Sequence, residues 1–507
     1  MPPPPSKQHP SKIPTVNTTS VSSSTSTDSD AAFDERLLST IAGPTYLVDW
    51  YGPSDAGNPQ NLPRWRKWLI TMSVALYVLT TTFSSSVFSA AAGVVAVEFG
   101  VKVETMVAAG TSMFMLGFAV GPLMFGPLSE RYGRKGPLVV GYLGFAILQL
   151  PVAEAHSVST IFIFRLLQGV FGSAPSAVLS GTLADIWTPQ QRGFAMPAVG
   201  SFLMIGPILG PIHVGMAMVR MPTDRLVFYI VAITSVSILV ITYPVLVETY
   251  SPVLLARRAK RMRSMTQNWA YRAKIEETET STRNVIEQCL AKPAKMLFLE
   301  PILLFMSLYI SVVFGLMYVF FLAYPMSFIR ERGWPQTRAG LPLLAILTGC
   351  ILGSLLISFT VKTRLAPNPQ KGRARETRML LMMIGAVLLP AGIFAFGYFS
   401  SADVSAWPQI LAGLPIGIGI ILINMQGLNY IIDCYGINSN SAIAANTFMR
   451  SLFASGFPVF ATSMYTSLGV EKATMILGGL GVVLMPIPVL FYCYGESIRK
   501  RSRWVPA

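Results

Sequence analysis

Apolar runs of about twenty residues recur along this chain and alternate with short polar segments. Each run is long enough to cross a bilayer core of ~30 Å as an α-helix. Helices are expected because a chain in lipid must satisfy its own backbone hydrogen bonds. The pattern predicts twelve membrane-spanning helices, at residues 69–92, 106–126, 137–154, 159–182, 194–218, 226–247, 299–323, 339–361, 379–400, 407–430, 441–466 and 473–494.

A long polar interval divides these helices into two groups of six. Two helical bundles joined by a linker form the repeated-half plan of many secondary transporters. We therefore predict an all-α membrane protein built from two six-helix bundles. The predicted divisions are an N-terminal tail (1–60), an N-terminal bundle (61–248), a central loop (249–297), a C-terminal bundle (298–495) and a short basic tail (496–507).

The composition agrees with a membrane protein. Of the 507 residues, 52% are hydrophobic and 12% are charged, with a mean hydropathy of +0.53, whereas soluble domains carry roughly 25% charged residues. The N-terminal tail is instead rich in Pro, Ser and Thr and lacks the apolar core of a signal peptide. Such a segment buries too little surface to fold, so the tail is predicted to be disordered.

The formal net charge of +15 has a topological explanation. Lys and Arg gather before the first helix, in the second–third, fourth–fifth and eighth–ninth loops, in the central loop and at the C-terminus, and the opposite loops hold few. The positive-inside rule then places both termini in the cytoplasm. We expect a multi-pass protein of the plasma membrane, with membrane lipid as a partner, no nucleic-acid partner and a monomeric state.

The central loop begins with a basic stretch in which Leu254, Leu255, Met262, Met265 and Trp269 fall among the cations at partly helical spacing. Two interpretations stay open, an interfacial helix on anionic lipid and a solvated linker. The four cysteines are scattered without metal-ligand spacing, so no metal site and no cofactor are predicted.

The turn between the second and third helices, GPLSERYGRK, concentrates charge between two apolar runs. We expect its glycines to allow close helix approach or a tight turn, and its charges to form an ion-pair latch at the cytoplasmic mouth. Asp185, at the end of the fourth helix, is the expected partner of Arg134. A generic basic turn would explain the cations but neither Glu130 nor the glycine spacing. The stretch resembles the signature of the major facilitator superfamily, G-x-L-x-D-R-x-G-R-[RK], through Gly126, Leu128, Glu130, Arg131, Gly133, Arg134 and Lys135, with Glu130 in place of Asp.

The fourth helix contains RLLQGVFG, which places Arg165 and Gln168 on one helical face. A buried arginine in hydrocarbon is costly, so Arg165 is expected to face a wet cavity and a partner. The run resembles the antiporter form of a superfamily motif, R-x-x-Q-G-x-x-G, which implies a role for Arg165 in proton coupling. The alternative is a structural arginine that donates to backbone carbonyls.

The fifth helix contains GSFLMIGPILGPIHVG, which resembles the superfamily's antiporter helix and implies export. Its prolines and glycines predict a pliant, closely packed seam between the bundles. The matching residues are Gly206, Pro207, Gly210 and Pro211. His213 stands near the usual second glycine pair, either as a proton site or as a hydrogen-bonded structural histidine.

Further stretches are similar to fungal members of the twelve-span drug:proton antiporter family. In one of them, AANTFMRSLF, Asn446 and Arg450 lie one turn apart, and Arg450 is the expected counterpart of Arg165. Flat aromatic faces with a few amides and hydroxyls suit amphipathic small molecules. The predicted substrate-binding residues are Tyr309, Tyr318, Phe321, Asn424 and Gln426.

These features predict a secondary active transporter that exports a small lipophilic drug, toxin or metabolite in exchange for protons. No Asp or Glu lies well inside a predicted helix, which favours neutral or weakly acidic substrates and leaves Arg165, His213 or Glu300 to take part in proton movement. A facilitator or importer on the same fold is the alternative. A membrane enzyme and a transporter-like sensor are less favoured, since the chain has no HxxxD, HExxH or ATP-binding loop and only a short C-terminal tail.

Overall fold

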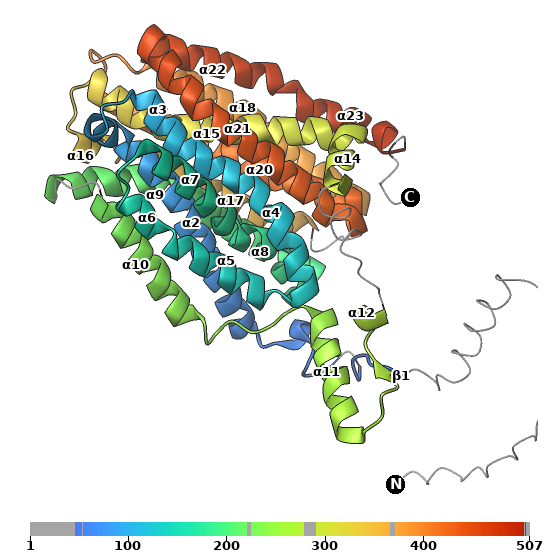
Figure 1. Ribbon diagram of the computed structural model, residues 1–507. Helices are drawn as coiled ribbons and strands as arrows, with labels where there is room; N and C mark the ends of the chain where they lie inside the picture. The colour runs from blue at the N-terminus through green and yellow to red at the C-terminus, as the bar shows by residue number, and fades with distance from the viewer. Residues whose placement is uncertain are drawn as a thin grey trace, which may run out of the picture.

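Two bundles of helices lie side by side in the computed structural model (Figure 1). The structure describes residues 46–52, 54–220, 225–277, 291–365, 371–500 and 502. Within them, ten helices are long and apolar enough to cross a membrane, and Val227–Thr242 is a shorter apolar helix. The helix Ser439–Leu468 has 30 residues and carries the polar Asn446 and Arg450. Together these make the twelve predicted spans.

Several spans are broken where proline enters the helix. The helix α8 carries Pro175 in its first turn and α23 begins at Pro486, where the missing proline N–H costs no helix hydrogen bond. The N-terminal bundle consists of α2 (Arg64–Glu98), α3 (Val103–Val107), the π-helix η2 (Ala108–Ser112), α4 (Met113–Tyr132), α5 (Lys135–Ile147), α6 (Gln149–Ala153), α7 (Val158–Gly172), α8 (Ala174–Ile186), α9 (Pro189–Arg220) and α10 (Arg225–Thr242).

The C-terminal bundle repeats this arrangement. In the first bundle α2 packs against α9, and at the same places of the second bundle α15 packs against α21. The elements of the second bundle are α14 (Lys292–Leu299), α15 (Pro301–Arg330), α16 (Gln336–Ala339), α17 (Leu343–Thr360), the π-helix η4 (Val361–Leu365), α18 (Lys371–Tyr398), α19 (Ala406–Leu411), α20 (Gly413–Tyr435), the 3-10 helix η5 (Gly436–Asn438), α21 (Ser439–Leu468), α22 (Val470–Leu484) and α23 (Pro486–Lys500).

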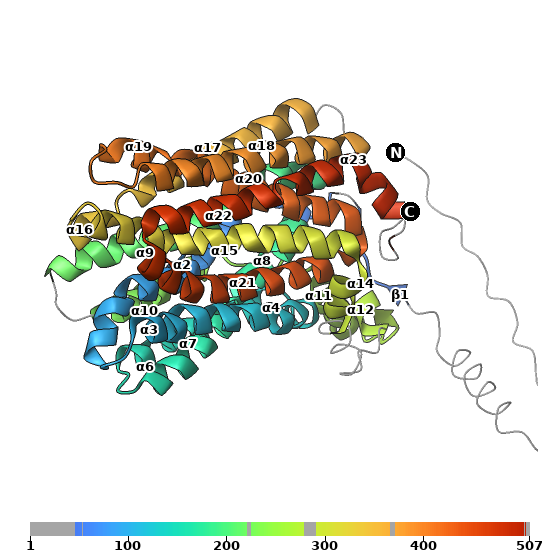
Figure 2. The ribbon, with the colours of Figure 1, turned by 90° about the horizontal axis from the view of Figure 1, so that it is seen from above.

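The bundles meet through α4 against α21 and α9 against α17. Figure 2 shows α11, α12, α14 and the C-terminal end of α23 at one end of the molecule, and α16 and α19 at the other. We call the first the terminal end, since the C-terminus lies there. The contacts between the two bundles differ at the two ends, and this difference determines where a cavity can open.

The tail prediction is wrong for residues 46–60, of which 46–55 contact the central loop and η1 packs on α8. The strand β1 (Tyr46–Leu47) pairs in parallel with β2 (Tyr271–Arg272), and η1 (Pro59–Asn61) follows. Asp55 forms an ion pair of 2.7 Å with Arg258. The carboxyl group also accepts from the backbone N–H groups of Tyr51 and Gly57, so its pKa falls to about 2, with the Arg258 hydrogen bond as the largest cause. The earlier residues lie outside the described part of the chain.

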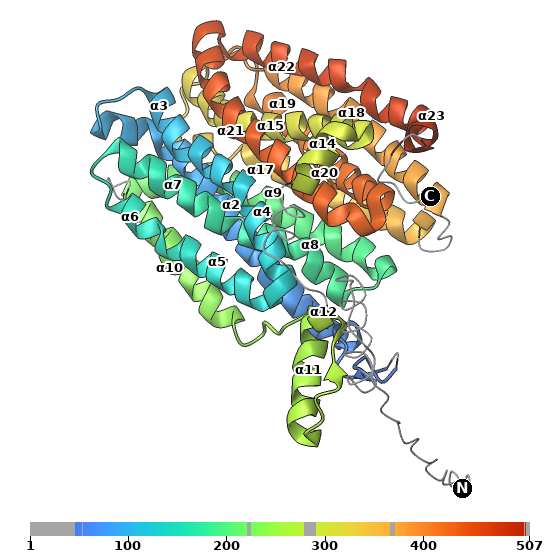
Figure 3. The same cartoon turned by 45° about the vertical axis from the view of Figure 1, so that its right-hand side comes forward.

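The central loop forms the helix α11 (Ser251–Thr266), followed by β2 and α12 (Lys274–Glu277). Figure 3 shows α11 projecting away from the bundles. Its apolar face packs on the tail through Val48, Leu255 and Met262. Met265 and Trp269 stay exposed. The helix itself is therefore confirmed, and contact with lipid stays a prediction.

Candidate functional site: a cavity between the two bundles

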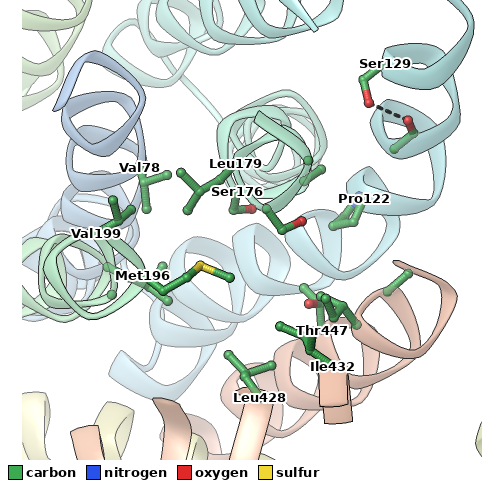
Figure 4. A pocket seen from close by; sticks show the side chains of 18 of the residues that line it. Val78, Pro122, Ser129, Ser176, Leu179, Met196, Val199, Leu428, Ile432 and Thr447 are labelled. Atoms are coloured by element: carbon green, nitrogen blue, oxygen red, sulfur yellow. Dashed lines mark hydrogen bonds between the residues drawn. The ribbon is translucent and has the colours of Figure 1, made fainter. Parts of the chain in front are cut away.

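A cavity lies between the bundles, with about 1130 Å³ of empty space when its open mouth is included. Figure 4 shows its walls, with Val78, Leu179 and Val199 from the N-terminal bundle and Leu428, Ile432 and Thr447 from the C-terminal bundle. Glu130, Arg134 and Ile443 bring the lining to the terminal end. A largely apolar cavity with a few polar groups in its wall suits a small organic molecule.

The bundles are joined on the other side of this cavity. Ser112 donates a hydrogen bond of 2.6 Å to the carbonyl oxygen of Ser455. A β-carbon on Gly340, directly after α16, would come within 3.1 Å of the backbone of Pro211 and Ile212 in α9. The structure is thus closed between the bundles at one end and hollow toward the terminal end.

The predicted substrate residues do not line this cavity, and their part in substrate binding stays a prediction. Tyr309, Tyr318, Phe321, Asn424 and Gln426 are all buried in helix packing. Tyr318, for example, forms a hydrogen bond of 3.0 Å with Ser85 across the bundles. The lining comes instead from α2, α4, α8 and α9 on one side and from α20 and α21 on the other. Sequence alone cannot tell which face of an apolar helix turns toward a cavity.

Arg165 is fully buried and does not line the cavity, contrary to expectation. Its Nε donates to the carbonyl oxygen of Gly110 at 2.9 Å, and its Nη2 donates to that of Ser84 at 3.1 Å. Its Nη1 donates to Oε1 of Gln168 at 2.9 Å, which confirms that these two side chains meet. Gly110 belongs to η2, a π-helical turn of the kind often found at functional sites.

The polar network around Arg165 joins four spans. Gln168 donates to Gln149 at 3.3 Å, Gln149 donates to Ser84 at 3.0 Å, and Ser84 also accepts from Arg165. The cation further lies 4.7 Å from the ring centre of Phe114. Burial of an arginine at such depth is tolerated because each guanidinium nitrogen has an acceptor.

Arg450 is buried in a different way. It lines the cavity with 4% of its surface exposed, and its Nε and Nη1 have no hydrogen-bond partner. The guanidinium lies 4.4 Å from the ring centre of Phe314. Asn446, one turn earlier, is fully buried with both side-chain polar atoms unpartnered. The expectation that Arg450 faces the cavity is confirmed, but its surroundings do not repeat those of Arg165.

The charged turn contains the predicted ion pair. Arg134 Nε lies 3.0 Å from Asp185 Oδ2, and Arg134 Nη1 donates to Ser129 at 2.8 Å. The guanidinium also lies 4.6 Å from the ring centre of Tyr250. Arg134 is buried, whereas its neighbours Glu130 and Arg131 are exposed and Lys135 is half-buried. The pairing with Asp185 is therefore confirmed.

The two glycines of the turn behave differently. Gly133 has φ +93°, and a β-carbon there would meet Oε2 of Glu248 at 2.2 Å. Gly126 has open space in the same position and lines the cavity, so its predicted role in close helix approach is wrong for this state. Sequence reasoning missed Glu248, which accepts from the backbone N–H of Arg134 at 2.7 Å and caps the start of α5. The sequence did place Glu248 directly after the sixth span, at the same end of the bundle as the charged turn, and this position could have suggested the contact.

The C-terminal bundle carries a copy of this ion pair. Arg378, at the start of the ninth span, has its Nε 2.9 Å from Oδ2 of Asp433, near the end of the tenth. Arg134 and Asp185 occupy the same places in the third and fourth spans. The two halves therefore share a charged contact as well as a helix order.

Comparison with known proteins decides the family. The model of the Major Facilitator Superfamily matches residues 74–458, which is most of the chain. The chain belongs to this superfamily.

Two curated superfamily relatives are fungal. The chain is 58% identical over 97% of its length to the "Cercosporin MFS transporter CTB4" of Cercospora nicotianae, of which the match covers 96%. It is 46% identical over 91% of its length to the "Citrinin biosynthesis cluster MFS transporter mrr1" of Monascus ruber, of which the match covers 93%. A solved structure of the proton:xylose symporter XylE has the same fold, with a TM-score of 0.60 and 15% identity over 85% of this chain and 96% of that one.

The helix α9, which carries the antiporter-like motif, packs on α2 of its own bundle and on α16 and α17 of the other. A β-carbon on Gly206 would meet Oγ1 of Thr82 at 2.1 Å, and one on Gly210 would meet Oγ of Ser86 at 2.1 Å. Both glycines therefore allow α2 to pack closely against α9. Gly206 and Gly210 therefore do not face the other bundle. The predicted seam is confirmed at Gly200, where a β-carbon would meet Sδ of Met425 at 2.3 Å, and at Pro211, against which Gly340 packs. The helix runs through Pro207 and Pro211 without interruption.

The remaining titratable candidates lie apart from the cavity wall. His213 has its ring centre 5.6 Å from that of Phe83, and its buried Nε2 has no hydrogen-bond partner, so this nitrogen does not fit the hydrogen-bonded interpretation. Glu300 is buried before α15 and accepts from the hydroxyl groups of Tyr435 and Ser502.

Proposed function

We propose that this transporter exports small amphipathic organic molecules, driven by protons moving in the opposite direction. The observation that carries the proposal is the cavity, which is mostly apolar, lies between two bundles and reaches the terminal end. With that end in the cytoplasm, as the loop charges predict, the structure is the state that takes up substrate from inside the cell. The fungal relatives named for cercosporin and for a citrinin cluster support metabolite export.

Alternating access requires the bundles to part at one end as they close at the other. The contact of Ser112 with Ser455 and of Gly340 with Pro211 must then open, and residues at the cavity mouth must approach. We assign the gate to the pair Arg134–Asp185 and its C-terminal copy Arg378–Asp433, because both lie at the terminal end. The remaining turn residues Glu130, Arg131 and Lys135 stay proposed parts of the gate.

Proton coupling is assigned to the network of Arg165, Gln168, Gln149 and Ser84. Together with the bond from Arg165 to the carbonyl oxygen of Gly110, its hydrogen bonds tie four spans together, so a change in one bond alters the contacts of the others. The resemblance of this motif to antiporters supports the assignment. His213 is the second candidate, since its Nε2 is free to accept a proton. A plasma-membrane location and a monomeric state complete the proposal.

The experiment is efflux from cells that express the protein. Cells are loaded with a fluorescent amphipathic dye, and its loss is followed with and without a protonophore. Faster loss than in cells with the empty vector, abolished by the protonophore, is expected. Dye entry accelerated by the protein would favour the importer instead.

A further inference from the structure

Arg450 and Arg165 are two arginines at comparable burial with opposite surroundings. The three nitrogens of Arg165 all donate to protein oxygens, two of them backbone carbonyls. Arg450 Nε and Nη1 have no acceptor, although the residue is 4% exposed. An unsatisfied buried cation is unfavourable, so a protein retains one where something else supplies the acceptors.

The position of Arg450 shows where those acceptors would come from. The residue belongs to the cavity wall, together with Thr447 of the same helix and Asn429 of α20. Asn446 adds an amide whose Nδ2 and Oδ1 are both buried without partners. The face of Phe314 supports the guanidinium from one side and leaves its edge for an in-plane partner.

The charge of the cavity wall is positive at this depth. Among the described lining residues, the charged ones are Glu130, Arg134 and Arg450. Arg134 is held by Asp185, and Glu130 is an exposed residue of the turn at the terminal end. Within the described part of the chain, Arg450 has no carboxylate within ion-pair distance.

We propose that Arg450, assisted by Asn446, binds the carboxylate or acidic phenolate of an organic anion whose flat apolar body lies in the cavity. The inference rests on the proposed function and specifies its substrate class. A guanidinium offers two parallel N–H donors that match a carboxylate. Apolar walls from Val199, Leu428 and Ile432 suit a ring system and disfavour a small hydrated anion such as phosphate (Figure 4). A neutral molecule of the same shape leaves the cation unpaired and binds more weakly.

The test compares two probes that differ in charge alone, 2-naphthoate and 2-naphthamide. The full-length protein is purified in detergent, and binding of each probe is measured by isothermal titration calorimetry. We expect the wild-type protein to bind naphthoate about tenfold to a hundredfold more tightly, the discrimination typical of a charge-assisted hydrogen bond. Arg450→Gln should abolish this preference, and Arg450→Lys should retain part of it.

Arg258→Gln is the matched control, because it makes the same change of charge at an arginine of α11 outside the cavity. It should keep the preference for naphthoate, and size-exclusion profiles verify the fold of every variant. Equal binding of the two probes by the wild-type protein, including no binding of either, would overturn the proposal, as would a preference that survives in Arg450→Gln. The dye-efflux assay tests the proposed function separately. If the protein exports a neutral dye but shows no preference for naphthoate, the anion-site proposal fails and the exporter proposal stands.

Discussion

Arg134 Nε lies 3.0 Å from Asp185 Oδ2, and this contact ties the turn between spans two and three to the end of span four. The pair is largely buried, with side-chain exposures of 8% and 15%. Tyr250, just beyond span six, covers the guanidinium. A single charged contact thus joins three segments of the N-terminal bundle at the mouth of the cavity.

Removal of this arginine is expected to destabilise the protein and slow transport. Arg134→Ala leaves the Asp185 carboxylate buried without its cation, at a cost of about 3–5 kcal/mol for a buried pair. Thermal unfolding in detergent and dye efflux measure the two effects. Arg257→Ala is the control, because Arg257 is an exposed arginine of α11 outside the gate and the cavity wall. Equal losses in both variants would show that the pair has no special role.

The two glycines of the turn should differ in their tolerance of alanine. Gly133→Ala forces a side chain into φ +93° and toward Glu248, which disturbs the cap of α5. Gly126→Ala meets open space. We expect Gly133→Ala to lower the melting temperature by several degrees and Gly126→Ala to leave it nearly unchanged, which a thermal-shift assay compares directly. The reverse order would contradict the structure.

Substitution of the two membrane arginines by lysine should separate stability from binding. Arg165→Lys loses most of the bonds to Gly110, Ser84 and Gln168, so it should unfold at a lower temperature. Arg450→Lys loses no partner at Nε or Nη1 and should change stability less. Melting curves of the two variants test this, and a larger loss in Arg450→Lys would contradict the contrast between them.

The contact between the tail and the central loop, formed by the Asp55–Arg258 ion pair and the β1–β2 pairing, should not change with pH in the physiological range. The pKa of Asp55 is lowered to about 2, so the carboxylate contributes stability above its ordinary pKa of 3.8 and loses it only as pH falls toward 2. The N–H of Val48 donates to the carbonyl oxygen of Arg272 at 2.9 Å, and its exchange, corrected for intrinsic rate, should be equally slow at pH 5 and pH 8. Asp55→Asn should reduce that protection at both values. Protection that falls between pH 8 and pH 5 in the wild-type protein would show that another group controls this contact.

Sequence was sufficient for the helices, because lipid forces each apolar run into a helix whose length is fixed by the bilayer. It also paired Arg134 with Asp185 and Arg165 with Gln168, since motif position and helical spacing place these groups together. It did not show that Tyr309 and Tyr318 lie off the cavity wall, because a helix buried on all sides has no polar stripe that marks its cavity face. It also missed the folding of residues 46–55, whose partners lie some 200 residues later in the central loop.

The most direct measurement of the central claim is transport by the purified protein in proteoliposomes. An acidic lumen is imposed, and uptake of the amphipathic dye and the luminal pH are followed together. The account predicts dye accumulation that requires the gradient, accompanied by a rise in luminal pH as protons leave. Dye uptake of equal rate with and without the gradient, or uptake with no proton movement, would contradict it.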